Sequence, residues 1–184
     1  MKSFSSFFTN LCVLAAIFAA SAMSAEISGP QVGDKISPFT VRGVLDDEAG
    51  KTIDLVKDAA GKPLLIFFVH ERTRPSIGLA RQVLNDAANR KSDGLEAGLV
   101  LLSADVGATK EWVKMVPQVL PRGVTIGVST DGELGPPAYN LSRKVAATII
   151  IAKDNRVVAN FALSQPNLDD DPKRISAAIA AALK

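Results

Sequence analysis

The sequence predicts an α/β fold in which a central mixed sheet carries helices on both faces and begins with an N-terminal β-hairpin. Two observations lead to this fold class. Short apolar runs alternate along the chain with longer segments of helical spacing, which is the order of βα units around a parallel sheet. Near the carboxyl end, two strand-like runs flank Asp154 and Asn155, a pair typical of a tight turn between antiparallel strands.

The first elements are short strands. Residues 39–45 alternate apolar and polar side chains, as a half-buried strand does. Residues 52–55 follow the turn residues 46–51 closely enough to return as the second strand of a hairpin. Residues 63–69 are apolar on both faces, which predicts a central strand that is covered on both sides.

Two helices and a strand come next. Residues 75–90 place apolar side chains on one face and polar side chains on the other, which predicts an amphipathic helix. Residues 98–104 are mostly apolar and predict a second buried strand. A second helix is expected over residues 109–120, with Thr109 as its cap and Pro117 shortening it.

The remaining elements complete the sheet and cover it. Three more strand-like runs occupy residues 124–129, 147–152 and 156–162. Residues 134–141 predict a short irregular or helical piece, because two prolines interrupt them. The last helix is expected to begin with Asp171 as its cap and Pro172 at its first helical position.

The amino terminus has the pattern of a secretory signal over residues 1–22. Lys2 precedes an uncharged run of 12 residues, 11–22, and small side chains suit cleavage within residues 22–25. An uncleaved membrane anchor is the alternative, but a membrane span needs about 20 apolar residues. Cleavage would leave one exported domain over residues 26–184, periplasmic or secreted and free of the membrane.

The composition excludes several kinds of chemistry. The only cysteine, Cys12, lies in the predicted signal, so the mature chain can form no disulfide and offer no thiolate. The net charge is only +2 and aromatic residues make up 5%, which argues against a nucleic-acid partner. His70 is the only histidine, so we expect no metal centre and no cofactor.

Four segments of the chain resemble one family in order and spacing. They read VGDKISPFTV, GKTIDLVKDAAGKPLLIFFV, TDGELGPPAYNL and TIIIAKDNRVV, at residues 32–41, 50–69, 130–141 and 148–158. The chain is similar to redoxins of the thioredoxin-like superfamily, the alkyl hydroperoxide reductase/thiol-specific antioxidant and thiol-disulfide oxidoreductase group. The resemblance covers nearly all of the mature chain, and it implies a thioredoxin-like fold and an origin in thiol redox chemistry.

The residues that carry that chemistry in the family are absent. The resemblance places Ser76 where the peroxidatic cysteine of a Thr-x-x-Cys motif would stand, with Thr73 as the threonine. The Cys-x-x-Cys pair of the thioredoxin branch is also missing, and residues 145–147 replace the family's cis-proline or arginine. A helix dipole can help to ionise a thiol, but it cannot ionise a serine hydroxyl. The chain therefore resembles a member of the family that lacks the active-site cysteines.

The corner between residues 63–69 and 75–90 remains the candidate site. Its side chains could hold an anion at a helix start, where free N–H groups and a positive dipole end meet. Residues 146–148 are expected to face this corner, since ligands of open α/β sheets bind at the strand carboxyl ends. The candidate binding residues are His70, Arg72, Thr73, Arg74, Ser76, Ala147 and Thr148. The alternative is structural, with Thr73 or Ser76 capping the helix and the arginines solvated.

The favoured interpretation is an exported thioredoxin-like domain without thiol redox chemistry, acting as a non-catalytic binding or scaffold module. Its partner would be an unidentified protein or a small anion. The alternative is an enzyme, either a redoxin-type oxidoreductase that uses a thiol supplied by a partner, or one that acts through Ser76. A serine nucleophile needs an adjacent base, and His70 is the only histidine available.

Overall fold

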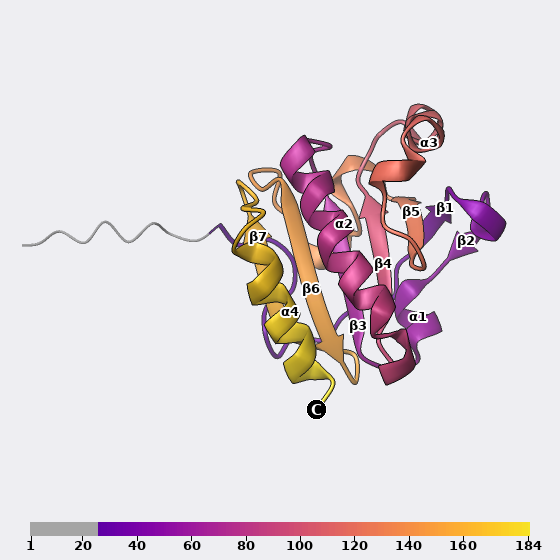
Figure 1. Ribbon diagram of the computed structural model, residues 1–184. Helices are drawn as coiled ribbons and strands as arrows, with labels where there is room; N and C mark the ends of the chain where they lie inside the picture. Colours follow the sequence, from indigo (N-terminus) through magenta and orange to yellow (C-terminus); the bar gives the residue numbers. More distant parts are fainter. Residues whose placement is uncertain (1–25) are drawn as a thin grey trace, which may run out of the picture.

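The computed structural model describes residues 26–184, so the predicted signal peptide over residues 1–22 and its cleavage site lie outside the described residues. Figure 1 shows the chain wound around one sheet. The strands are β1 (Val41–Gly43), β2 (Thr52–Ile53), β3 (Leu64–Val69), β4 (Glu96–Leu101), β5 (Thr125–Ser129), β6 (Ala147–Lys153) and β7 (Arg156–Leu163). The helices are α1 (Leu55–Ala59), α2 (Arg74–Asn89), α3 (Val106–Met115) and α4 (Asp171–Ala182).

The seven strands form one mixed sheet in the order β2-β1-β5-β4-β3-β6-β7. Strand β3 pairs in parallel with β4 and antiparallel with β6, and β4 pairs in parallel with β5. The β1–β2 hairpin lies at one edge and β7 at the other. This arrangement confirms the predicted mixed sheet and N-terminal hairpin. All six residues of β3 are buried, as expected for an apolar central strand.

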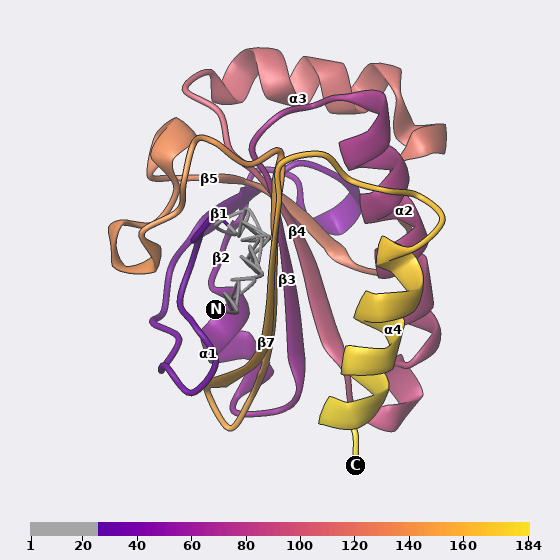
Figure 2. The same ribbon diagram turned by 90° about the vertical axis from the view of Figure 1, so that its left-hand side faces the viewer.

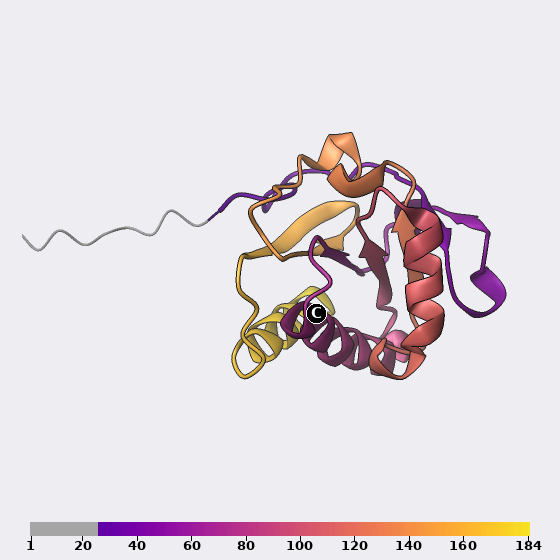
Figure 3. The same cartoon turned by 90° about the horizontal axis from the view of Figure 1, so that it is seen from above.

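One face of the sheet is covered by α2 and α4, which lie side by side in Figures 1, 2 and 3. Their apolar stripes pack against alternate residues of β3, β4 and β6. The opposite face is covered by α1 and by loops rather than by long helices. Three aromatic rings fill that side, Phe39, Phe68 and Tyr139, with ring centroids 5.1–5.6 Å apart. The Tyr139 hydroxyl donates to the carbonyl of Ser37 at 2.9 Å, so its burial leaves no unpaired oxygen.

Two helices differ from the sequence expectation. The run predicted as a strand over residues 52–55 contains only β2, because Asp54 caps α1 by accepting from the N–H groups of Val56 and Lys57. Helix α3 begins earlier than predicted, with Asp105 rather than Thr109 as its N-cap. Thr109 is buried inside the helix, where its hydroxyl bonds to the Asp105 carbonyl at 2.8 Å.

The carboxyl-terminal elements agree with the prediction except for one cap. Asp154 and Asn155 adopt φ values of 52° and 58° between β6 and β7, as the tight hairpin turn requires. Asp171 was expected to cap α4, but it lies in the first turn instead. Its buried carboxylate accepts from the Asn167 N–H at 2.8 Å and from Arg174 at 2.9 Å. It therefore stabilises the helix start from within the first turn.

An N-terminal arm, residues 26–38, crosses β6 and β7. The Ser28 hydroxyl hydrogen-bonds to the Thr148 hydroxyl at 2.6 Å, and the Asn160 amide donates to the carbonyls of Ser28 and Pro30. Further along, the arm pairs with the backbone of Val157 at the start of β7. None of the described helices is long and apolar enough to cross a membrane.

Candidate functional site

The predicted corner is the turn between β3 and α2. Thr73 is the N-cap of α2, with extended backbone angles, and its Oγ1 accepts from the Ser76 N–H at 3.3 Å. Pro75 follows in the first turn, where its missing N–H costs nothing. The cap and the proline together remove two of the donors that an anion at the helix start would use. The start of α2 therefore offers few free N–H donors of its own.

Ser76 lies beneath this cap rather than on the surface. Its side chain is 0% exposed, and its Oγ shares a 2.8 Å hydrogen bond with Thr73 Oγ1. A buried hydroxyl in such a bond is satisfied and shielded from a ligand. The position that the resemblance assigns to a reactive cysteine is thus occupied by a structural serine.

Replacing Thr73 with alanine is expected to destabilise the protein by about 1–2 kcal/mol. The substitution removes the cap of α2 and leaves the buried Ser76 hydroxyl without its partner. Urea unfolding of the wild type and the variant gives the free energies of unfolding. Thr73→Ser is the matched control, since it keeps the hydroxyl oxygen. Its loss of free energy of unfolding should be less than half that of Thr73→Ala. Equal losses in the two variants would contradict this account of the corner.

His70 belongs to a separate chain of hydrogen bonds. Its Nε2 lies 2.9 Å from Thr148 Oγ1, and Thr148 in turn contacts the Ser28 hydroxyl. Burial lowers the pKa of His70 to about 4, so the imidazole is neutral at pH 7. Within the described residues no hydrogen bond joins His70 to Ser76.

The facing segment, residues 146–148, lies beside the corner as predicted, but its side chains are buried. Ala147 and Thr148 are both 0% exposed. The Ala146 carbonyl accepts from the N–H groups of His70 and Glu71 at 3.0 and 3.2 Å, and the Ala146 N–H donates to Leu163. These backbone groups already have partners, so a ligand could not pair with them. Within the predicted set, Ser76, Ala147 and Thr148 are buried and His70 is partly exposed; the fully exposed members are Arg72, Thr73 and Arg74.

A groove opens directly beside these three residues, with a volume of about 470 Å³. One face of α2 forms its floor through Arg74, Ile77, Gly78, Arg81 and Gln82, which recur at helical spacing. The remaining walls are Arg72 and Thr73 of the corner, Trp112 of α3, Val119 of the following turn and Leu168 of the loop before α4. We call this hollow the corner groove.

The charge of the corner groove has one sign. Its lining includes Arg72, Arg74 and Arg81 and no aspartate or glutamate. Within residues 26–184, none of these arginines forms an ion pair. All three side chains are exposed, and the arginine guanidinium is a positively charged group. The groove is therefore electropositive over an apolar base.

Arg72 is held in place. Its guanidinium lies over the Trp112 ring, 5.3 Å from the ring centroid, and its Nη1 is 3.4 Å from the Thr109 hydroxyl. A cation above an aromatic face gains about 0.5–1 kcal/mol at an exposed site. This contact reduces the side-chain freedom that a ligand would otherwise have to remove.

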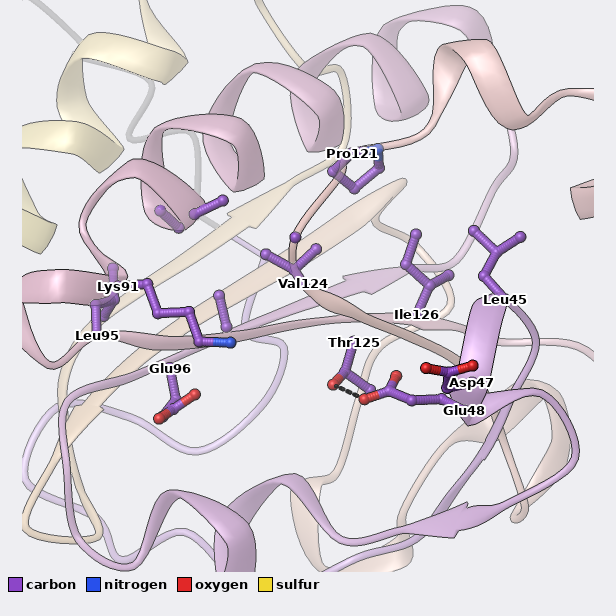
Figure 4. A pocket seen from close by; sticks show the side chains of 14 residues that line it. Leu45, Asp47, Glu48, Lys91, Leu95, Glu96, Pro121, Val124, Thr125 and Ile126 are labelled. Carbon is purple, nitrogen blue, oxygen red and sulfur yellow. Dashed lines mark hydrogen bonds between the residues drawn. The ribbon is translucent and has the colours of Figure 1, made fainter.

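A second hollow, of about 290 Å³, lies at the opposite end of the sheet (Figure 4). Its charges are mixed: Lys91 faces it together with Glu48 and Glu96. Glu48 accepts from the Thr125 hydroxyl at 3.0 Å, and Glu96 pairs with Lys62 at 3.1 Å. Among the described residues, no group of three or more metal-ligating side chains occurs. This hollow offers no single sign of charge for a ligand to recognise.

Sequence reasoning missed part of the corner groove. Arg81, Trp112 and Leu168 line the groove, but they are not among the candidate binding residues that the sequence indicated. The spacing of Arg74 and Arg81, with Gly78 between them, was the available signal, since residues seven apart share a helix face. The contribution of Leu168 depends on the path of the loop before α4, and nothing in the sequence indicates that path.

Comparisons with known proteins identify the fold. No family model and no curated protein matches the sequence. A solved structure from Chlorobium tepidum, provisionally assigned as the thiol:disulfide interchange protein DsbE, is 19% identical with a TM-score of 0.67, covering 84% of this chain and 99% of its own. The peroxidoxin BcpB of Mycobacterium tuberculosis is 14% identical, with a TM-score of 0.58 and coverages of 82% and 97%. A secreted disulfide oxidoreductase of the same organism is 16% identical, with a TM-score of 0.50 and coverages of 78% and 95%. The chain has a thioredoxin-like fold, as its sequence predicted.

Proposed function

We propose that this chain is a thioredoxin-like binding module that recognises negatively charged groups at the corner groove and carries out no thiol chemistry of its own. The observation that carries the proposal is the groove, where three arginines without ion-pair partners surround an apolar base. A concave site with a few convergent polar groups is the usual form of a ligand site. Residues 26–184 contain no cysteine that could add redox chemistry to it.

The geometry gives little support to a serine-based enzyme. A nucleophilic serine needs a base within hydrogen-bond reach, and that base needs a free nitrogen lone pair aimed at it. Ser76 bonds to Thr73, which is not a base, and His70 directs its Nε2 to Thr148. A pKa of about 4 also makes His70 a weak proton acceptor near neutral pH.

The second candidate is an oxidoreductase that works with a thiol supplied by a partner. The names of the similar structures favour it, since they include a thiol:disulfide interchange protein and a disulfide oxidoreductase. One of those proteins is described as secreted, which agrees with our proposal that this chain is exported to the periplasm or beyond. In this case the corner groove would hold the partner while the partner's own cysteines react.

A thermal-shift panel tests the proposed function. The mature protein is melted at low salt with phosphate, sulfate, acetate and succinate, beside Arg74→Gln and the matched control Arg156→Gln. Arg156 is also exposed but begins β7, at the far end of the sheet from the corner. An anion at about 100 times its Kd should stabilise the wild type by about 2.7 kcal/mol, which is several degrees. We expect this rise to shrink in Arg74→Gln only.

The controls separate binding from general salt effects. Sulfate and phosphate stabilise most proteins by exclusion from their surfaces, and such a rise would be equal in all three proteins. An equal rise, or none, would rule out the corner as an anion site. For the second candidate, the wild type is added to a reduced dithiol protein that is reducing insulin. Faster reduction than the dithiol protein achieves alone would favour the oxidoreductase over the binding module.

A further inference from the structure

The corner groove has an apolar half that a simple anion would leave unused. It is lined by Ile77, which is buried, by Val119 and Trp112, which are half-buried, and by Leu168, which is exposed. Leu168 is 39% exposed although it sits against the groove. Apolar side chains that stay open to water in a concave site mark a place where a ligand would bury them.

Gly78 lets Leu168 pack closely against α2. Its φ is negative, so the backbone does not require glycine there. A Cβ at this position would lie 3.3 Å from Leu168 Cδ1, tighter than ordinary contact. Glycine inside a helix costs about 1 kcal/mol relative to alanine. Its presence allows Leu168 to approach α2 and form one wall of the groove.

The spacing of the charges fits an extended peptide. Arg74 and Arg81 lie on the same face of α2 seven residues apart, which is about 10 Å along the helix axis. A peptide in the extended polyproline II conformation has three residues per turn and rises about 3.1 Å per residue, so side chains three positions apart share a face and lie about 9 Å apart. Two acidic side chains three positions apart could therefore reach both arginines while the residues between them lie over the apolar base.

We propose that the corner groove binds a segment of a partner protein in which acidic residues flank large apolar ones. This inference rests on the proposed function and adds the chemistry of the ligand to it. Arg72, already fixed on Trp112, would meet the backbone or a third carboxylate at the mouth of the groove. The apolar side chains of the segment would cover Ile77, Val119 and Leu168.

The sequence supplies a direct reporter for this binding. Trp112 is the only tryptophan of the chain, and it lines the groove. Its fluorescence is measured while the mature protein is titrated with acetyl-Glu-Leu-Phe-Glu-amide at low salt. Two matched peptides are titrated in parallel: one replaces both glutamates with glutamine, and the other replaces the leucine and phenylalanine with glycine. We expect the first change to weaken binding about fivefold and the second at least about tenfold.

Protein variants locate the contact. Arg81→Gln and Leu168→Ser should each raise the Kd of the parent peptide about threefold to fivefold. Arg156→Gln and Leu134→Ser are the controls, because both side chains are exposed and lie outside the groove, and they should change the Kd less than twofold. All four variants alter exposed side chains, so each should fold, and their melting curves verify this.

The outcomes separate this inference from the proposed function. If the glycine peptide binds as tightly as the parent, the apolar half takes no part and the inference fails, while the anion site stands. If the glutamine peptide binds as tightly, the arginines take no part in peptide binding and the inference fails. Absence of any fluorescence change and any thermal shift up to millimolar peptide overturns the inference. The small-anion panel then decides separately whether the arginines bind charge.

Discussion

Replacing Phe68 with alanine is expected to lower the free energy of unfolding by about 3–5 kcal/mol. Phe68 is 0% exposed and lies in the central strand β3. Its ring is 5.6 Å from that of Phe39 and 5.5 Å from that of Tyr139, so the substitution removes two aromatic contacts and leaves a cavity between them. Side chains on the other face of β3 cannot move into that cavity, because they are packed against α2 and α4.

Urea unfolding measures this loss, with Phe161→Ala as the matched control. Phe161 belongs to the edge strand β7 and is only partly buried, so its truncation should cost clearly less. A loss this large can approach the whole stability of a domain, and Phe68→Leu therefore serves as a second variant, with an expected loss of about 1 kcal/mol. A smaller effect of Phe68→Ala than of Phe161→Ala would show that the aromatic cluster is not a centre of the core.

Acidification should destabilise the protein through His70. In the unfolded chain this histidine takes up a proton near its ordinary pKa of 6.5, whereas burial lowers its pKa in the folded protein to about 4. The unfolded state therefore binds more protons between these two values, and stability falls as the pH drops from 6.5 towards 4. The stability that depends on an uncharged His70 is fully present above pH 6.5. Between pH 7 and pH 5 we expect a loss of about 1–2 kcal/mol from this group, reduced by its partial exposure.

Carboxylates also take up protons in acid, so the effect of His70 is measured as a difference between the wild type and a variant without the histidine. Free energies of unfolding are determined from pH 7 to pH 4.5 for the wild type and for His70→Gln, which can still reach the Thr148 hydroxyl. The gap between the two proteins should shift in favour of the variant as the pH falls. Parallel curves would mean that His70 protonates equally in the folded and unfolded states, and the buried environment assigned to it would be wrong.

The strands were predictable because their patterns are strong. The uniformly apolar run ending at Val69 is the central strand β3, and Asp154 with Asn155 forms the turn between β6 and β7. The weaker predictions failed at caps, where several residues could play the same part. Asp105 and Thr109 both stand shortly before apolar residues of this helix, so the sequence alone does not show which of them is the cap. In the folded protein the Asp105 carboxylate accepts from the Ala108 N–H, which makes Asp105 the cap.

The candidate site was predictable in position but not in detail. The resemblance and the polar residues after β3 located the corner correctly along the chain. The sequence could not show that Ser76 would be buried or that His70 would bond to Thr148, because each contact depends on how distant segments pack. Three separate segments form the corner groove: α2, the segment that carries Trp112 and the loop that carries Leu168.

Proteolytic removal of the N-terminal arm would change the edge of the sheet. Strand β7 ends the sheet, and the unpaired backbone groups of an edge strand invite pairing with another molecule. The arm occupies part of that edge, where the Gly33 N–H donates to Val157 and the Val157 N–H donates to Asp34. A protease that removed the arm would uncover these groups and the buried Thr148 hydroxyl together. The arm therefore covers part of a sheet edge that would otherwise be open to pairing with another molecule.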